Sequence, residues 1–281
     1  MRPLLALIAI MLIVSGVHAL GTVQKSARDL AVKDLVARAS AYVESYQQDF
    51  KFVVADESTE QNAHGPGAEI SSRKTHGELF LTYLIAERMW LSVRDVKDVD
   101  GQVVVERDDL PALLRESPVR AVAEQLLRHN ARYNLGNVVR NFNEPTIALL
   151  VLGRTHVSRF KFSRVAVNQH EPDETAVTLA FEERDRPTLV KGTGGKSVFS
   201  TGEVTIEPLS GRVHRTRILV RDGATTAELT TSFEWHGGVE LWVPTLFEER
   251  YVAKRPRGDE VITSETWYSN YRRFQAEGRV R

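Results

Sequence analysis

Residues 229–243 read LTTSFEWHGGVELWV, and this stretch decides the fold. Apolar or β-branched side chains occupy every second position on both sides of a Gly-Gly pair, at Leu229, Thr231, Phe233 and Trp235 and then at Val239, Leu241 and Val243. A period of two predicts strands with one face in a core and one face in water. Because so short a turn joins only antiparallel neighbours, the stretch predicts two adjacent strands of an antiparallel meander.

The same period continues through most of the chain, and turn residues separate its segments. Further strands are predicted at residues 52–60, 74–85, 89–99, 159–162, 177–182, 202–207 and 213–220. Turns are predicted at Asp100-Gly101, Gly192 to Gly195, Pro208 to Gly211 and Asp222-Gly223.

Two regions have helical spacing instead. Near the N-terminus, Ser26 and Asp29 resemble a capping box. The apolar positions that follow are spaced as on one face of a long helix: Val32, Val36, Ala39, Val43, Tyr46 and Phe50. A helical insert is predicted over residues 108–152, with Ser117-Pro118 starting one helix and Asn143 capping a second that Gly153 stops. We therefore predict a single α+β domain, residues 20–281, with both helical regions packed on a large antiparallel sheet.

Composition limits the kinds of partner and site. The 281 residues include 37 basic and 37 acidic side chains and no cysteine. Balanced charge creates no field that would favour nucleic acid, which is therefore not an expected partner. Without cysteine there can be no thiolate zinc site, cysteine nucleophile, disulfide or lipid-anchored cysteine. The 42% of hydrophobic residues suffices for a substantial core, so packing must stabilise the fold.

The first residues are typical of an export signal. Arg2 precedes an apolar run over residues 4–14, and the Val17-His18-Ala19 that follows has small residues at the two positions that a signal peptidase recognises. We predict cleavage after Ala19 and a mature protein that works in the periplasm or outside the cell. The run is shorter than the roughly 20 apolar residues of a transmembrane helix, and an uncleaved anchor is the alternative. No transmembrane span is predicted in the mature chain.

Motifs for catalysis or for a bound cofactor are missing from the sequence. Residues 194–197 (GGKS) resemble the end of a phosphate-binding loop, but Val190 stands where that motif needs glycine, and a strand follows where it needs a helix. A hairpin tip is predicted there. The histidine pairs lack the close spacing of a metal site: His64 with His76, and His214 with His236. No cofactor and no metal are therefore expected.

Four ionisable residues are candidates for a polar cluster: Arg94, Asp95, Glu182 and Arg250. Glu182-Glu183 and Glu248-Glu249 are adjacent carboxylates on predicted strands, so only one of each pair can face inward. An inward Glu182 or Glu248 would need a cationic partner such as Arg94, Arg186 or Arg250. A structural ion pair is the simpler interpretation. If Asp98 joined the cluster in one cleft, the site would suit a hydrolase-type enzyme, but no nucleophile with its base is visible. An enzyme is therefore the weakest functional alternative.

The chain has more large aromatic side chains than a flat sheet needs. Ordinary core packing is one interpretation. The other is that a strongly curved sheet leaves a pocket for an apolar ligand, lined by Phe80, Trp90, Phe142, Trp235, Trp242 and Tyr251. The ligand would be a lipid, an acyl chain or a lipidated protein. The alternative function is a protein-interaction or sensing module of the envelope, without a small-molecule ligand.

A set of short motifs runs along nearly all of the mature chain. They are residues 94–96 (RDV), 99–101 (VDG), 131–136 (ARYNLG), 159–162 (RFKF), 186–188 (RPT), 207–208 (EP), 211–213 (GRV), 242–244 (WVP), 249–251 (ERY) and 268–274 (YSNYRRF). As a set they resemble a family of uncharacterised exported bacterial proteins. This resemblance implies no named activity.

The order of elements is similar, more distantly, to the outer-membrane lipoprotein carriers and the related periplasmic sigma-factor regulators (LolA- and RseB-like proteins). The predicted strands 202–207 and 213–220, joined by a Pro-x-x-Gly turn, carry this likeness. It implies an N-terminal helix, a curved antiparallel half-barrel and a helical lid over an apolar cavity. The chain departs from that pattern by its longer insert, and the lipid-binding arginine of the carriers cannot be placed on it.

Overall fold

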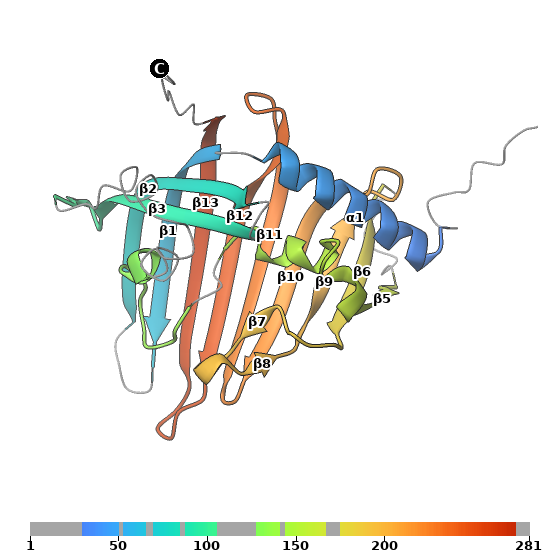
Figure 1. Ribbon diagram of the computed structural model, residues 1–281. Helices are drawn as coiled ribbons and strands as arrows, with labels where there is room; N and C mark the ends of the chain where they lie inside the picture. The colour runs from blue at the N-terminus through green and yellow to red at the C-terminus, as the bar shows by residue number, and fades with distance from the viewer. Residues whose placement is uncertain are drawn as a thin grey trace, which may run out of the picture.

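The computed structural model describes residues 30–50, 53–65, 70–84, 88–105, 128–140, 144–166 and 175–273. The predicted signal segment, the helix start at Ser117-Pro118 and Phe142 lie outside these ranges. The described residues form one large sheet with helices on one of its faces (Figure 1).

Eleven strands form this sheet, in the order β4-β3-β2-β1-β13-β12-β11-β10-β9-β6-β5. The strands are β1 Val53–His64, β2 Ser71–Leu84, β3 Met89–Val99, β4 Gln102–Val103, β5 Phe160–Arg164, β6 Val177–Glu183, β9 Ser200–Ile206, β10 Val213–Asp222, β11 Thr225–His236, β12 Leu241–Ala253 and β13 Glu260–Arg273. All neighbours are antiparallel. β1 pairs with β13, so strands from distant parts of the sequence are neighbours within the sheet.

The predicted meander and its turns are confirmed. Residues 229–243 form the end of β11, a short turn and the start of β12. Asp100 and Gly101 have φ values of 52° and 80°, the left-handed conformation that a tight hairpin turn between β3 and β4 requires. Residues 190–198 form a small separate hairpin, β7 Val190–Lys191 and β8 Ser197–Val198, with the 3-10 turn η4 Thr193–Gly195 at its tip. The hairpin tip predicted at residues 194–197 is therefore confirmed.

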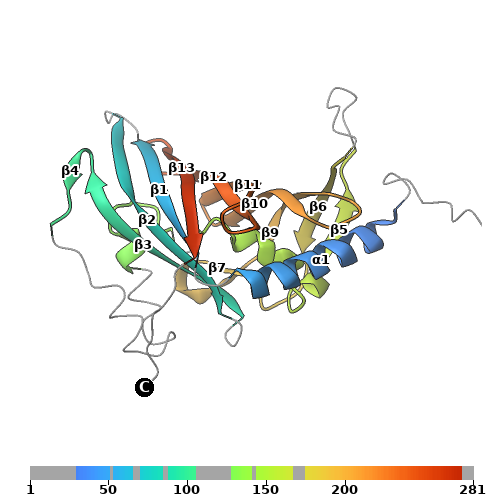
Figure 2. The ribbon, with the colours of Figure 1, turned by 90° about the horizontal axis from the view of Figure 1, so that it is seen from above.

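Helix α1, Val32–Asp49, packs across one face of the sheet (Figures 1 and 2). Its buried residues recur every three or four positions, at Leu35, Ala39, Val43 and Tyr46, and Gln47 beside Tyr46 is buried as well. Beside it lies the 3-10 helix η2, Ile147–Leu152, which ends before Gly153 as predicted but is tighter than an α-helix. Another short 3-10 helix, η3 Val157–Arg159, leads into β5.

The sheet is curved and open, with β4 and β5 as its two edges. α1, η2 and the β7–β8 hairpin all lie on its concave face (Figures 1 and 2). The predicted fold class, an α+β half-barrel with a long N-terminal helix on a large curved antiparallel sheet, is confirmed.

The turn before β10 holds α1 in place, and glycine is required there. Gly211 has a φ of +75°, and a methyl group on it would lie 2.3 Å from the carbonyl group of Arg38 in α1. Gly223 also has a positive φ, +59°, but no atom lies within 4 Å of a methyl group placed there. We expect Gly223→Ala to lower the free energy of unfolding by about 1 kcal/mol, the cost of the left-handed conformation. Gly211→Ala should lower it by about 2 to 4 kcal/mol, because α1 must also move.

Urea denaturation of the two variants measures this difference. Equal losses of stability would show that the contact between this turn and α1 adds nothing to the fold.

Candidate functional site

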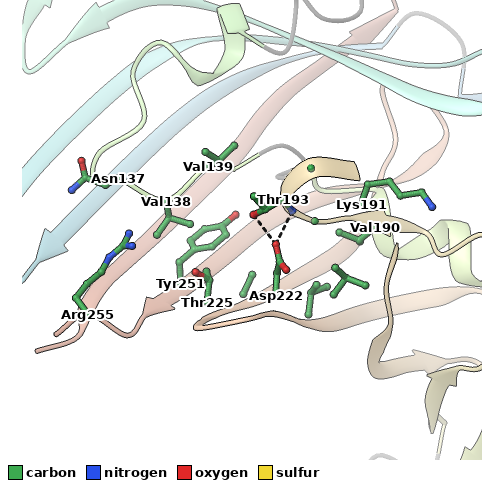
Figure 3. A pocket seen from close by; sticks show the side chains of 15 residues that line it. Asn137, Val138, Val139, Val190, Lys191, Thr193, Asp222, Thr225, Tyr251 and Arg255 are labelled. Atoms are coloured by element: carbon green, nitrogen blue, oxygen red, sulfur yellow. Dashed lines mark hydrogen bonds between the residues drawn. The ribbon is translucent and has the colours of Figure 1, made fainter. Parts of the chain in front are cut away.

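An open cavity of about 440 Å³ lies on the concave face, where β10, β11 and β12 approach the β7–β8 hairpin (Figure 3). One wall is the end of a segment that we call the strap, residues 128–140, and the opposite wall is the hairpin. The lining residues are Asn137, Val138, Val139, Val190, Lys191, Gly192, Thr193, Gly194, Val198, Val220, Asp222, Thr225, Ala227, Tyr251 and Arg255.

The floor of this cavity is apolar because three neighbouring strands place inward positions side by side. Val220 of β10 is paired with Ala227 of β11, which is in turn paired with Tyr251 of β12. Val190 and Val198 from the hairpin continue the floor. All five are buried, with at most 8% of their surface exposed. The cavity therefore offers methyl groups and one tyrosine ring to whatever enters it.

Polar groups at the rim are fixed by hydrogen bonds. Asp222 accepts from the backbone N–H of Thr193 at 2.7 Å and from its hydroxyl at 2.9 Å, which ties the hairpin to β10 (Figure 3). The same two bonds hold the pKa of Asp222 below its usual value. Asp222 is therefore ionised at neutral pH, and its Oδ2 accepts both bonds.

Next to the cavity lies a set of buried charges that we call the buried polar network: Glu57, Arg94, Arg140, Glu144 and Glu249. Arg94 Nε lies 3.1 Å from Glu57, and Arg140 Nη1 lies 3.9 Å from Glu249. The Tyr251 hydroxyl donates to Glu249 at 2.6 Å, so the tyrosine of the cavity floor also belongs to this network. Burial raises the pKa of Glu249, although Arg140 and Tyr251 oppose the shift. The network fills its part of the concave face, where the remaining cavity is about 20 Å³.

Polar contacts fasten the strap over the network. Asn130 donates to the Ser92 carbonyl at 2.8 Å and accepts from the Arg94 N–H at 2.9 Å. The Tyr133 carbonyl accepts from Gln61 at 3.1 Å. Asn137 donates its backbone N–H to Glu260 at 2.7 Å. The strap thus crosses from β3 to β13 on hydrogen bonds, with Leu135 and Val138 as its partly buried apolar contacts.

The aromatic residues predicted to line a cavity are dispersed. Of the five that the structure describes, Tyr251 alone lines the open cavity. Trp90 is buried in the core, with its ring 5.5 Å from that of Phe50. Trp242 is half-buried in an edge-to-face contact with His214, Phe80 is half-buried on β2, and Trp235 is 57% exposed. Trp90 cannot line an opening because aromatic side chains of the helical region already cover it.

The four predicted polar residues do not share a site. Arg94 is buried against Glu57, Asp95 follows it on β3, and Arg250 is exposed. Glu182 is also exposed and pairs with Arg184 at 2.6 Å. Asp98, considered for an enzyme site, accepts the Gly101 N–H at 3.0 Å in the β3–β4 turn.

In both glutamate pairs the second residue is the buried one: Glu183 in the first pair and Glu249 in the second. Glu183 accepts from the backbone and the hydroxyl of Ser200, at 3.1 and 3.0 Å, and Glu249 belongs to the network. Sequence reasoning missed Arg140 and Glu57. Glu57 carried a usable signal, since it shares the alternation of Val53 and Ala55, which face the core.

Within the described ranges, no group of three or more histidine, aspartate or glutamate side chains is placed to hold a metal ion. Among the same residues, no helix is both long enough and apolar enough to cross a membrane.

Comparisons with known proteins find several solved structures that are similar in fold to this chain. A domain described as an outer membrane lipoprotein-sorting protein, from Vibrio parahaemolyticus, is 13% identical; the match covers 86% of this chain and 93% of that one, with a TM-score of 0.41. A DUF1329 family protein from Desulfovibrio piger is 10% identical, with 88% and 94% covered and a TM-score of 0.39. A LolA superfamily protein from Nitrosomonas europaea is 9% identical, with 88% and 94% covered and a TM-score of 0.30. No family model and no curated protein matches the chain.

The pKa of Glu144 makes the network sensitive to pH. Burial raises this pKa from 4.5 to about 7, although the Ser92 hydroxyl, which donates at 3.1 Å, and Arg94 lower it. Between these two pH values the folded chain binds a proton that the unfolded chain has lost, so this group's contribution to stability falls as pH rises through the window. Glu144→Gln keeps the acceptor for Ser92 without the charge. We expect the variant to exceed the wild type in unfolding free energy by roughly 3 kcal/mol at pH 8, and by much less at pH 5.

Chemical denaturation at pH 5, 6, 7 and 8 measures this difference, with Glu265→Gln as the control at an exposed glutamate of β13. A difference between variant and wild type that is the same at all four pH values would contradict the assignment.

Proposed function

We propose that this chain is a binding protein of the cell envelope that holds an apolar ligand in the open cavity of its sheet. The ligand would be a lipid, an acyl chain or the lipidated end of another protein. The observation that carries the proposal is the cavity of about 440 Å³ with its floor of valine, alanine and tyrosine side chains. This volume falls within the range of about 300 to 1,000 Å³ that small-molecule sites occupy.

The composition of the floor favours binding over catalysis. Val190, Val198, Val220 and Ala227 contribute no polar atoms from their side chains, and the hydroxyl of Tyr251 is already bonded to Glu249. An apolar chain laid on this surface would leave no polar group of the floor without a partner. Each methylene buried there would contribute about 0.8 kcal/mol to binding.

The N-terminal sequence supports the location. The apolar run over residues 4–14 and the peptidase-like site at Ala19 are typical of exported proteins, and a chain without cysteine needs no particular redox environment. A carrier or receptor of apolar molecules has a clear use in the aqueous space of the envelope, because such molecules do not cross water unaided.

A second candidate is a protein-interaction module. Trp235 and Trp267 expose 57% and 40% of their surface, and Arg212 stacks over the half-buried Trp242 ring at 5.0 Å. Tryptophan and arginine are enriched among the residues that dominate protein interfaces. In that case the partner would be another envelope protein, and the cavity would be incidental.

Native mass spectrometry of the mature protein from its own envelope distinguishes the two. A stoichiometric adduct that organic extraction identifies as a lipid or acyl chain is expected for the ligand-binding function. An unliganded mass that does not change when lipids and lipopeptides are added would reject it in favour of the interaction module.

Filling part of the cavity should weaken binding without unfolding the protein. Thr225 lines the cavity at the start of β11, and Thr226 is the next residue, which does not line it. We expect Thr225→Trp to weaken binding of a fluorescent fatty acid at least about tenfold, equivalent to ~1.4 kcal/mol, because the indole occupies the ligand's space. Thr226→Trp, with the same side chain on the other face, should bind as the wild type does. Equal binding by both variants would place the ligand elsewhere.

A further inference from the structure

We propose that the ligand is an anionic amphiphile and that Arg255 binds its carboxylate or phosphate headgroup. This inference rests on the proposed function, since it assigns a chemical class to the ligand of the same cavity.

Three of the lining residues carry charge at neutral pH: Lys191, Asp222 and Arg255. Figure 3 shows Arg255 at one end of the cavity and Lys191 at the other, with Tyr251 between them and Asp222 toward the lysine end. The lysine amine donates to Ser197 at 3.1 Å and points away from the floor (Figure 3). The end at Arg255 is therefore where a headgroup would meet a positive charge.

The Arg255 side chain is held but remains accessible. Its Nη2 donates to Glu260 at 3.2 Å, and 47% of the side chain is exposed. The guanidinium has five N–H donors in a planar fork, and the one hydrogen bond from Arg255 found within the described residues uses a single nitrogen. The rest of the fork can bind a second oxyanion.

Glu260 does not neutralise Arg255 toward an incoming oxyanion, because the Glu260 carboxylate is already hydrogen-bonded to the strap. Its Oε1 accepts from Asn137 twice, from the backbone N–H at 2.7 Å and from the side-chain amide at 3.1 Å. The Glu260 side chain is 11% exposed, whereas that of Arg255 is 47% exposed. An incoming oxyanion thus meets the guanidinium before it meets the carboxylate.

The apolar floor begins beside this charge. From Arg255 the lining runs past the Tyr251 ring toward Val190 of the hairpin (Figure 3). Ala227, paired with Tyr251, and Val220, paired with Ala227, continue the floor across the sheet. A molecule with an oxyanion at one end and an acyl chain at the other would match this arrangement, in which a positive charge is followed by an apolar surface. A cationic headgroup would be repelled by Arg255, and a neutral one would gain only a weak hydrogen bond.

Three probes with the same twelve-carbon chain test the headgroup at low salt and pH 8: dodecanoate and dodecyltrimethylammonium, each below its micelle concentration, and dodecanol, below its solubility limit. Calorimetric titration of the mature chain should give dodecanoate about tenfold tighter binding than dodecanol, which is ~1.4 kcal/mol, and the ammonium compound the weakest. Arg255→Gln should bring dodecanoate to the affinity of dodecanol. Arg255→Lys, which keeps the charge but loses the fork, should fall between the two.

The matched control is Arg257→Gln, since Arg257 is exposed in the same turn and does not line the cavity. It should leave the preference for dodecanoate unchanged. Equal binding of dodecanoate and dodecanol, or a preference that survives Arg255→Gln, would overturn the headgroup assignment while the apolar site stands. Failure of all three probes to bind would overturn the proposed function together with this inference.

Discussion

An open sheet of eleven strands, spaced about 4.8 Å apart, is roughly 48 Å wide, whereas a helix of 18 residues is about 27 Å long. α1 therefore cannot cover the whole concave face. Under the helix the face is apolar and closed, with Tyr46, Phe50 and Trp90 in mutual contact. Beyond the end of the helix, other segments must shield the concave face of the sheet from water, and we call them the second cover. The strap, the buried polar network and the β7–β8 hairpin supply it, and the open cavity lies where this second cover is incomplete.

The second cover differs in chemistry from the first. Removing charged groups such as Arg94 and Glu57 from water costs free energy and so opposes folding. The attraction between the two charges offsets this cost only when their geometry is good and their remaining polar atoms are hydrogen-bonded. The strap is consequently held by a specific set of hydrogen bonds and by little apolar area. A wall of this kind can form one side of a binding site without closing it.

Much of the fold could be predicted because strand alternation is local. The stretch 229–243 indicated both strands and their direction, and Asp100-Gly101 indicated a hairpin. The site could be predicted far less well. A period of two shows which residues share a face, and Glu183 shares the face of Leu179 and Phe181, so the alternation favoured it over Glu182. The period does not show which distant residues lie opposite, so the partners of Glu183 and Glu249 could not be named. The aromatic set failed for another reason: whether Trp90 lines a pocket or a core depends on where α1 ends on the sheet, which is a non-local fact.

Tyr251 belongs both to the cavity floor and to the buried polar network. Its ring belongs to the cavity floor, while its hydroxyl is bonded to Glu249, and the Arg140 guanidinium lies 5.5 Å from the centre of the ring. The polar end of the tyrosine is thus satisfied inside the protein, and its ring is left to face the cavity. A phenol with an unbonded hydroxyl would demand a polar ligand, since burying it would cost about 1 to 3 kcal/mol. By engaging that hydroxyl, the buried polar network keeps the neighbouring floor apolar. The charges beside the cavity and the absence of an unbonded polar group on its floor are therefore two consequences of one arrangement.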